Sequence, residues 1–316
     1  MVFCLAFLYE GDTQSKVLDP IVFDTGRVLG VSEVSADAML DAELYKLPLS
    51  EETGVSTPKK VENVRDLSLG NCSALVMDSG TGEVLYAQAS EEVRPIASIT
   101  KLMTALVFLE NNPGWDNYYQ ISSRDRLNGG RVYVYNGEMV KVRDLFHLSL
   151  VASANTATKA LMNSTGLSEE DFIEAMNYMA QKLDLQNTNF IDVVGFSAGN
   201  TSTAKEIALL LQEALSYEEI SKATQMSEYT FVTEAGRKGR VDSTNYLVDS
   251  WEESAIDYEG GKTGHTDLAG YCFTGAFRNS LGNGILSVVL GTDTPSSRFN
   301  LTEKMMQWTY ASYIWN

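Results

Sequence analysis

The sequence of 316 residues contains only three cysteines and two histidines. Three cysteines are too few for a disulfide framework, and their odd number leaves at least one unpaired. Two histidines argue against a histidine-rich metal site, so we expect no metal and no cofactor. A Ser-His-Asp triad would have to use His147 or His265, and neither lies in a known triad motif.

Long hydrophobic runs are also missing. The apolar run at residues 2–9 is far shorter than the ~20 residues that a membrane-spanning helix needs. It has no charged segment before it, so it is at most the trimmed remnant of an export signal, or a trimmed start of the chain. Membrane association is therefore expected only through segments that are not in this chain.

Positive charge is scarce. The chain has 24 lysines and arginines against 42 aspartates and glutamates, which gives a formal net charge of −18. Nucleic-acid binding depends on lysine and arginine to neutralise phosphates, so we expect no nucleic-acid partner. The acidic balance is typical of a soluble, self-repelling surface and carries no information about catalysis.

Residues 1–70 differ from the rest and are predicted to be an N-terminal extension with a linker. Short strands are expected at 20–23 and 27–31, a short helix at 36–45, and a polar, turn-rich linker at 49–60. No function follows from this composition.

Residues 71–316 show clearer patterns. Strands are expected at 73–78, 83–87, 261–265, 268–279 and 284–292, and helices at about 98–111, 143–165, 168–183, 202–216 and 296–313. The helix at 98–111 is apolar on most sides, which is typical of a helix in a domain centre. This order predicts an α+β fold, with one antiparallel sheet built from N- and C-terminal segments beside a helical cluster.

The first chemical motif is Ser98-Ile99-Thr100-Lys101 at the predicted start of a helix. Residues three apart share a helix face, so Lys101 can reach the Ser98 hydroxyl. A serine hydroxyl needs a base to become a nucleophile, and a buried lysine of lowered pKa can serve. The alternative for Ser98 is a simple helix N-cap.

Two further motifs follow. Ser153-Ala154-Asn155 lies 55 residues after Ser98, and Lys262-Thr263-Gly264 lies on a predicted strand. A strand lysine followed by a hydroxyl and a glycine can bind a carboxylate at an open sheet edge. The ordered set SxxK, SxN and KTG is the signature of penicillin-binding proteins and class A β-lactamases.

The resemblance is closer than these motifs. Residues 71–316 resemble the low-molecular-mass penicillin-binding proteins that act as serine D-alanyl-D-alanine carboxypeptidases. It rests on the segments 98–104, 202–208 and 262–271, and on the Arg298 segment that opens the last helix. It implies a penicillin-binding-protein/β-lactamase-like fold, a D-Ala-D-Ala stem peptide of peptidoglycan as the substrate, and β-lactams as acylating inhibitors.

The resemblance also implies roles for individual residues. Ser98 would be the nucleophile and Lys101 its base, while Ser153, with Lys262 nearby, would pass a proton to the leaving D-alanine. Asn155 would hold the substrate amide. The backbone N–H groups of Ser98 and His265 would form the oxyanion hole. Gly264 would let the substrate approach the backbone of the strand closely. Thr263 and Arg298 would hold the terminal carboxylate. Because peptidoglycan is the substrate, the domain is expected outside the cytoplasmic membrane.

Two alternatives remain open. A β-lactamase would need a deacylating base between SxN and KTG, and the candidates Glu169, Glu170 and Glu174 fall in a predicted helix. A non-catalytic descendant that binds peptidoglycan or a partner protein would have no need of Lys101 beside Ser98. A transpeptidase is also chemically possible, because only the acceptor differs.

Two structural questions remain as well. Cys72 and Cys272 fall on predicted strands of one sheet, so a disulfide between them is conceivable. His147 lies in an apolar run and is expected to be a core histidine.

Overall fold

The computed structural model describes residues 57–315, except residues 66, 128 and 251–255. These residues belong to one compact unit, which runs from Val55 to Asn316. The strands and the helix predicted between residues 20 and 45 lie outside the described residues, as does most of the predicted linker.

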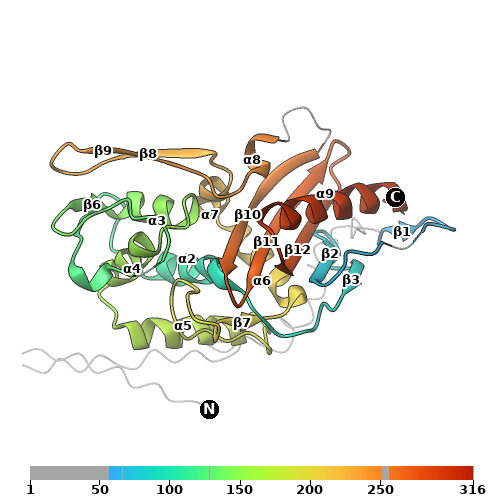
Figure 1. The fold of residues 1–316 in the computed structure, drawn as a ribbon, viewed down its shortest axis with the longest axis horizontal. Helices are drawn as coiled ribbons and strands as arrows, with labels where there is room; N and C mark the ends of the chain where they lie inside the picture. Colours follow the sequence, from blue (N-terminus) through green and yellow to red (C-terminus); the bar gives the residue numbers. More distant parts are fainter. Residues whose placement is uncertain (1–56, 66, 128, 251–255, 316) are drawn as a thin grey trace, which may run out of the picture. The chain divides into compact units, whose positions relative to one another are not determined.

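A five-stranded sheet forms the centre of this unit (Figure 1). Its strands, in the order in which they lie side by side, are β10 (Ile256–Thr266), β11 (Gly270–Asn279), β12 (Gly284–Thr292), β2 (Ser73–Asp78) and β3 (Val84–Gln88). All four pairings are antiparallel. The N-terminal hairpin of β2 and β3 thus joins the three C-terminal strands through the pairing of β2 with β12. The predicted α+β fold is confirmed.

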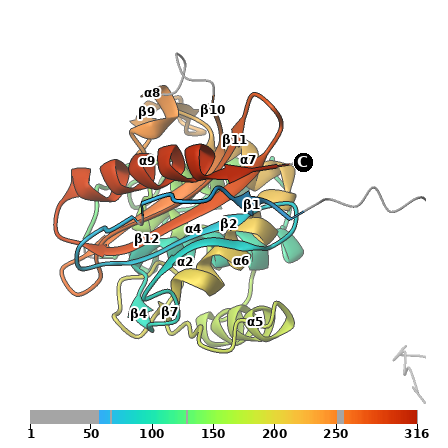
Figure 2. The same cartoon turned by 90° about the vertical axis from the view of Figure 1, so that its right-hand side faces the viewer.

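Both faces of this sheet are covered. Alternate residues of a strand point to opposite faces, so Leu75 and Met77 join one apolar cluster while Ala74 and Val76 join the other. Helix α9 (Pro295–Ser312) covers the second face, and α6 (Ala204–Ser216) packs on the first (Figure 2). Two-sided coverage explains why all six residues of β2 are buried.

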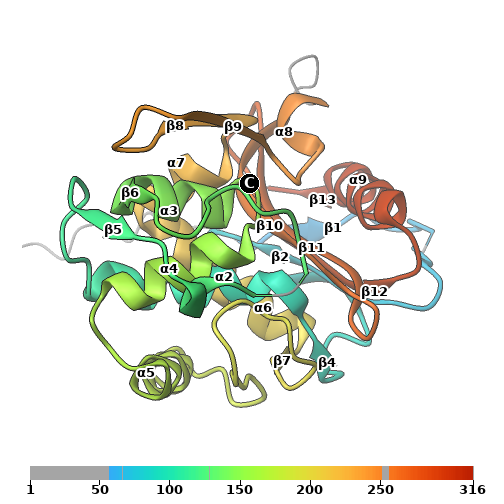
Figure 3. The same cartoon turned by 60° about the vertical axis from the view of Figure 1, so that its left-hand side comes forward.

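The helical cluster surrounds α2 (Thr100–Glu110), which follows the 3-10 turn η2 (Ala97–Ile99). Its residues are buried from Thr100 to Phe108, as its apolar circumference predicted. It packs against α6 and against α3 (Val142–Leu150), α4 (Asn155–Ser164) and α5 (Glu169–Lys182) (Figure 3). Side-chain caps start two helices near their predicted positions: Ser168 accepts from Asp171 N, and Thr203 accepts from Glu206 N.

The prediction of one helix over residues 143–165 is wrong. The structure has two helices there, α3 and α4, separated at residues 151–154. Ser153 adopts a left-handed backbone with φ 54°, and the carbonyl of Val151 accepts a hydrogen bond from Thr244 N at 3.1 Å. Since both helices bury apolar residues in the same core, the apolar pattern continues through the break and concealed it.

Several elements were not anticipated. They are the short helices α7 (Glu218–Thr224), α8 (Leu247–Ser250) and η3 (Ser123–Asp125), and the strand pairs β4 (Arg94–Pro95) with β7 (Thr201–Ser202), β5 (Tyr118–Gln120) with β6 (Met139–Lys141), and β8 (Glu228–Val232) with β9 (Lys238–Asp242). Tyr229 fastens the β8–β9 hairpin to α3. Its hydroxyl donates to Asp144 Oδ1 at 2.6 Å, and its ring stacks on His147 at 4.3 Å. His147 is thus half-buried beneath the hairpin rather than inside the core.

The start and end of the unit meet at a small second sheet. Strand β1 (Lys59–Lys60) pairs antiparallel with β13 (Tyr313–Ile314). Trp308 Nε1 on α9 donates to Arg65 O at 2.9 Å, and Lys304 Nζ donates to Ser68 O at 3.0 Å. Part of the segment that the sequence assigned to the extension therefore packs on the last helix.

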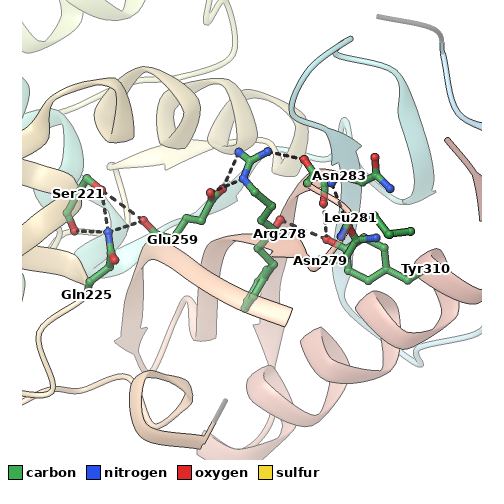
Figure 4. Close-up of polar contacts among 10 residues, drawn as sticks. Ser221, Gln225, Glu259, Arg278, Asn279, Leu281, Asn283 and Tyr310 are labelled. Carbon is green, nitrogen blue, oxygen red and sulfur yellow. Dashed lines mark hydrogen bonds and ion pairs between the residues drawn. The ribbon is translucent and has the colours of Figure 1, made fainter. Parts of the chain in front are cut away.

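The far ends of β10 and β11 are held by an ion pair. Arg278 Nε lies 2.5 Å from Glu259 Oε1, beside the irregularity between Tyr258 and Gly260 (Figure 4). Gln225 Nε2 on the neighbouring segment donates to Glu259 O at 3.0 Å. These contacts hold the N-terminal part of β10, which precedes the KTG motif on the same strand.

A disulfide between Cys72 and Cys272 does not form, because both thiols are free and buried. Cys72 belongs to the apolar cluster under α9, whereas Cys272 belongs to the cluster on the opposite face of the sheet. The shared sheet that suggested the pairing therefore separates the two residues. Burial raises the pKa of both thiols, that of Cys272 to about 11.

We expect a Cys4→Ser protein to keep the same Tm with or without reductant, because Cys72 and Cys272 share no bond to break. A thiol reagent should react with both cysteines only after unfolding, since buried thiols of raised pKa react slowly. Thiol titration in denaturant without reductant checks this. Fewer than two reactive thiols, or a Tm that falls with reductant, would contradict it.

Candidate active site

Ser98 lies where the chain turns from β4 into α2. The preceding residue, Ala97, has a φ of 47°, a strained value for a residue other than glycine. The cap positions of η2 and α2 are Ile96 and Ile99, and neither helix start has a side-chain cap. The N-cap alternative for Ser98 is therefore contradicted, and its hydroxyl is free for another role.

Lys101 is buried within hydrogen-bond distance of three oxygen atoms. Its Nζ lies 2.7 Å from Ser98 Oγ, 2.9 Å from Asn155 Oδ1 and 2.9 Å from Val194 O. Burial lowers the pKa of Lys101 to about 7, against an opposing effect of the Asp192 charge. A neutral amine in this position can donate to Asn155 and Val194 while it accepts the Ser98 proton. The geometry is that of a nucleophile and its base.

The SxN segment occupies the break between α3 and α4. Asn155 is the first residue of α4, and its Nδ2 donates to Gly129 O at 3.3 Å. Ser153 Oγ is buried and has no hydrogen-bond partner among the described residues. A buried hydroxyl without a partner is available for a further hydrogen bond. Strained backbone thus occurs immediately before SxxK, at Ala97, and within SxN, at Ser153.

The KTG motif lies on β10, the edge strand of the sheet. Lys262 is buried, and its Nζ donates to Thr263 O at 3.1 Å. Burial holds the pKa of Lys262 well below its usual value, and the charges of Lys101 and Arg298 act in the same direction. Thr263 Oγ1 lies 2.6 Å from Thr244 Oγ1. The two motif lysines are thus close enough for their charges to interact.

Gly264 allows β10 to approach the nucleophile. A Cβ at this position would lie 2.7 Å from Ile96 O and 3.2 Å from Ser98 N, closer than side-chain carbons normally come. Arg298 lies on the other side of the strand: its Nη1 donates to Gly264 O at 3.1 Å, and its guanidinium lies 4.7 Å from the ring centre of Phe299. Arg298 is buried and holds β10 through the backbone.

A cavity of about 490 Å³ opens over Ser98. Its lining residues are Ser98, Gly129, Gly130, Asn155, Val194, Gly195, Phe196, His265, Thr266, Asp267 and Leu268. Of the predicted site residues, Ser98, Asn155 and His265 line it. Lys101, Lys262 and Thr263 are buried, and Arg298 is held behind the strand. His265 is exposed, and its ring stacks on Tyr271 at 3.9 Å.

The sequence analysis missed the loop that supplies Val194 O. Asp192 shapes this loop, because its Oδ1 accepts from Val194 N at 2.8 Å and from Gly195 N at 2.6 Å. Its other oxygen accepts from Ser197 N at 2.7 Å. A Cβ at Gly195 would lie 1.9 Å from Ala97 O, so the loop touches the turn before Ser98. An aspartate three residues before a glycine is a turn signal, and it could have indicated this loop.

The comparisons with known proteins agree with this geometry. A family model described as D-alanyl-D-alanine carboxypeptidase, Peptidase S11, matches residues 59–294. The chain belongs to this family. The predicted family is thereby confirmed, and the solved structures similar to this chain confirm the predicted fold.

Individual relatives are similar over most of the chain. D-alanyl-D-alanine carboxypeptidase DacF of Bacillus subtilis is 30% identical, over 76% of this chain and 62% of its own length. A D-alanyl-D-alanine endopeptidase of Pseudomonas aeruginosa is 33% identical, over 72% of this chain and 74% of its own. The cefotaxime-bound structure of penicillin-binding protein D2 from Listeria monocytogenes is 33% identical with a TM-score of 0.66, over 78% of this chain and all of its own. This chain thus spans less than two thirds of DacF.

The lowered pKa of Lys101 predicts how acylation depends on pH. Ser98 attack needs the neutral amine, whose fraction rises as pH increases through about 7. We expect the rate of acylation by a β-lactam to rise about tenfold per pH unit below this value and to level off above it. Stopped-flow labelling from pH 5 to 9 measures the profile. A rate that is flat, or that falls between pH 6 and 8, would exclude Lys101 as the base.

Asp192 provides a second prediction. Its charge raises the pKa of Lys101, so Asp192→Asn should move the midpoint of the acylation profile to lower pH. Asp192→Ala also removes the acceptors that shape the loop and should reduce the plateau rate by about tenfold or more. Asp184→Asn, an exposed carboxylate outside this loop, is the matched control. An unchanged midpoint in Asp192→Asn would show that its charge does not act on Lys101.

Proposed function

We propose that this chain is a serine carboxypeptidase that removes the terminal D-alanine from peptidoglycan stem peptides ending in D-Ala-D-Ala. The observation that carries this proposal is the 2.7 Å contact between Ser98 Oγ and the buried amine of Lys101, beside a cavity that Ser98, Asn155 and His265 line. The family match supports the same reaction.

The first half of the reaction is acylation. Ser98 Oγ attacks the carbonyl carbon of the D-Ala–D-Ala bond while Lys101 Nζ takes its proton. The backbone N–H groups of Ser98 and His265 would stabilise the oxyanion, and Asn155 would hold the substrate amide. Ser153, whose hydroxyl has no partner among the described residues, would relay this proton from Lys101 to the departing amine, so that Lys101 is neutral again. D-alanine leaves, and an ester on Ser98 remains.

The second half is hydrolysis of this ester. Water attacks the acyl carbon, Lys101 accepts a proton from the water and passes it to Ser98 Oγ, and Ser98 leaves as a hydroxyl. The terminal carboxylate of the substrate would lie against β10, where Thr263 would donate a hydrogen bond from its hydroxyl, while Arg298 behind the strand would act through the backbone of Gly264. Gly264 keeps that strand close to Ser98. A β-lactam would follow the first half and then remain on Ser98.

The β-lactamase alternative has little support in the geometry. Glu169 lies at the start of α5, where its carboxylate is 2.5 Å from Lys159 Nζ. It lines a neighbouring hollow of about 260 Å³ rather than the cavity over Ser98. The non-catalytic alternative does not explain why Lys101 is buried. Burying an amine lowers the stability of the fold, and a protein that only binds has no need of it.

The substrate implies the location. The family and the relatives are named for D-alanyl-D-alanine peptidase activity. Because the proposed peptidoglycan substrate lies outside the cytoplasmic membrane, we propose that this domain works on the outer side of that membrane. None of the described helices is both long enough and apolar enough to cross a bilayer. Membrane association through other segments stays a prediction, as does the division into an extension at 1–70 and a catalytic domain at 71–316.

Labelling with a fluorescent penicillin, together with D-alanine release from a peptide ending in D-Ala-D-Ala, tests the proposal. We expect long-lived label and D-alanine release from the wild type, and neither from Ser98→Ala. Lys101→Met should slow acylation by about 10²- to 10⁴-fold, the usual contribution of a general base. Ser296→Ala, an exposed serine on α9, is the control.

Three outcomes would count against the proposal. Label lost within seconds, with rapid destruction of the penicillin, would indicate a β-lactamase. A folded wild type without label would remove Ser98 as the nucleophile and favour a binding protein. Stable label without D-alanine release, but with transfer to an added amine, would indicate a transpeptidase.

A further inference from the structure

Thr244 joins the SxN break to the KTG strand. The β8–β9 hairpin lies over α3, and the segment that follows β9 leads from there toward the central sheet (Figure 1). In this segment Thr244 N donates to Val151 O at 3.1 Å, just before Ser153 in the chain. Its side chain reaches the other motif, because Thr244 Oγ1 lies 2.6 Å from Thr263 Oγ1. One residue therefore bridges two motifs that are far apart in the chain.

The hydroxyls of Thr244 and Thr263 have no other hydrogen-bond partner among the described residues. Thr263 is buried and Thr244 is half-buried. Each hydroxyl has one proton, so the contact between them uses one proton and leaves the other free. Whether Thr263 can donate to a ligand therefore depends on which of the two hydroxyls donates within the pair.

A substrate carboxylate would decide this direction. Thr263 is the proposed donor to the terminal carboxylate, which can only accept hydrogen bonds. If Thr244 donates to Thr263, the Thr263 proton is free for the carboxylate; in the opposite arrangement that proton is already used. A hydroxyl that accepts one hydrogen bond donates a stronger one, above all to a charged acceptor. The geometry therefore favours a chain from Thr244 to Thr263 to the carboxylate.

The segment around Thr244 is anchored by hydrogen bonds of its own. Ser243 N donates to Ser227 O at 2.7 Å at the base of the hairpin, and Asn245 N donates to Ser243 Oγ at 3.1 Å. Asn245 is buried, and its Oδ1 accepts from Leu247 N at 3.0 Å. None of these contacts uses the Thr244 hydroxyl. A substitution that removes only this hydroxyl is therefore expected to leave the segment in place.

We propose that Thr244 is a positioning residue for the terminal carboxylate of the substrate: its hydroxyl donates to Thr263 and leaves the Thr263 proton free for that carboxylate. Thr244 acts through Thr263 and does not touch the reacting atoms. Because Thr244 N is bound to Val151 O, the same residue also ties the carboxylate end of the site to the SxN segment. This inference rests on the proposed function, which places a carboxylate at Thr263.

Substrates with and without the carboxylate test this role. One pair is an acyl-D-Ala-D-Ala peptide and the acyl-D-Ala ethyl thioester, which has the same acyl part but no terminal carboxylate. The other pair is benzylpenicillin and its methyl ester. We expect Thr244→Val to lower kcat/KM for the peptide by about three- to tenfold, the usual range for one hydrogen bond, and to leave the thioester value nearly unchanged. Acylation by benzylpenicillin should slow to a similar extent, and acylation by its methyl ester should not.

Three further variants separate positioning from a general loss of structure. Thr244→Ser keeps the hydroxyl and should restore the wild-type ratio of the peptide to the thioester. Thr230→Val removes an exposed threonine hydroxyl on β8 of the same hairpin and should change neither value. Added to Thr263→Val, the Thr244→Val substitution should cause little further loss, because its effect passes through Thr263.

An equal loss for the peptide and the thioester in Thr244→Val would overturn the inference, because it would show a structural role only. An unchanged peptide value would overturn it as well, and so would a full additional loss on the Thr263→Val background. The proposed function fails differently: the wild type would release no D-alanine. Labelling of Ser98 by benzylpenicillin and its methyl ester then still tests Thr244. A wild type that neither releases D-alanine nor takes the label would overturn both.

Discussion

Lys101 places an amine in the core of the domain, and oxygen atoms from three separate segments surround it. Ser98 belongs to the same helical turn, Asn155 begins α4, and Val194 lies on the Asp192 loop. A buried ammonium group is costly unless it is paired or neutral, and this cost lowers the pKa of Lys101 to about 7. The same burial that makes Lys101 expensive for stability makes it a base at neutral pH.

The surrounding backbone is shaped to bring these segments together. Ala97 and Ser153 adopt left-handed conformations that most residues avoid, and Gly195 and Gly264 allow contacts that a Cβ would prevent. Such strain persists only where neighbouring structure holds it. Here the sheet does so from one side, because β10 lies against the turn before Ser98. The Asp192 loop does so from the other.

Much of the site was visible in the sequence because its motifs are short and local. Ser98 and Lys101 are one helical turn apart, so their contact follows from helix geometry alone. The interaction of Lys262 with the charge of Lys101 could not be predicted in this way, since it depends on how β10 lies beside α2. The loop at Asp192 was missed because its effect on Lys101 passes through a backbone carbonyl, which leaves no mark in side-chain patterns. The break before Asn155 was hidden by an apolar pattern that continues through it.

The sequence by itself determined the α+β composition, the five strands of the central sheet, the pairing of Ser98 with its neighbouring lysine, and the family. These depend on local periodicity and on motif spacing, which adjacent residues record. Only the tertiary structure decided that Cys72 and Cys272 lie on opposite faces of the sheet, that helix 143–165 divides at Ser153, and that Arg298 holds β10 from behind. These depend on contacts between residues far apart in the chain, and burial and packing decide such contacts only after the whole unit has folded.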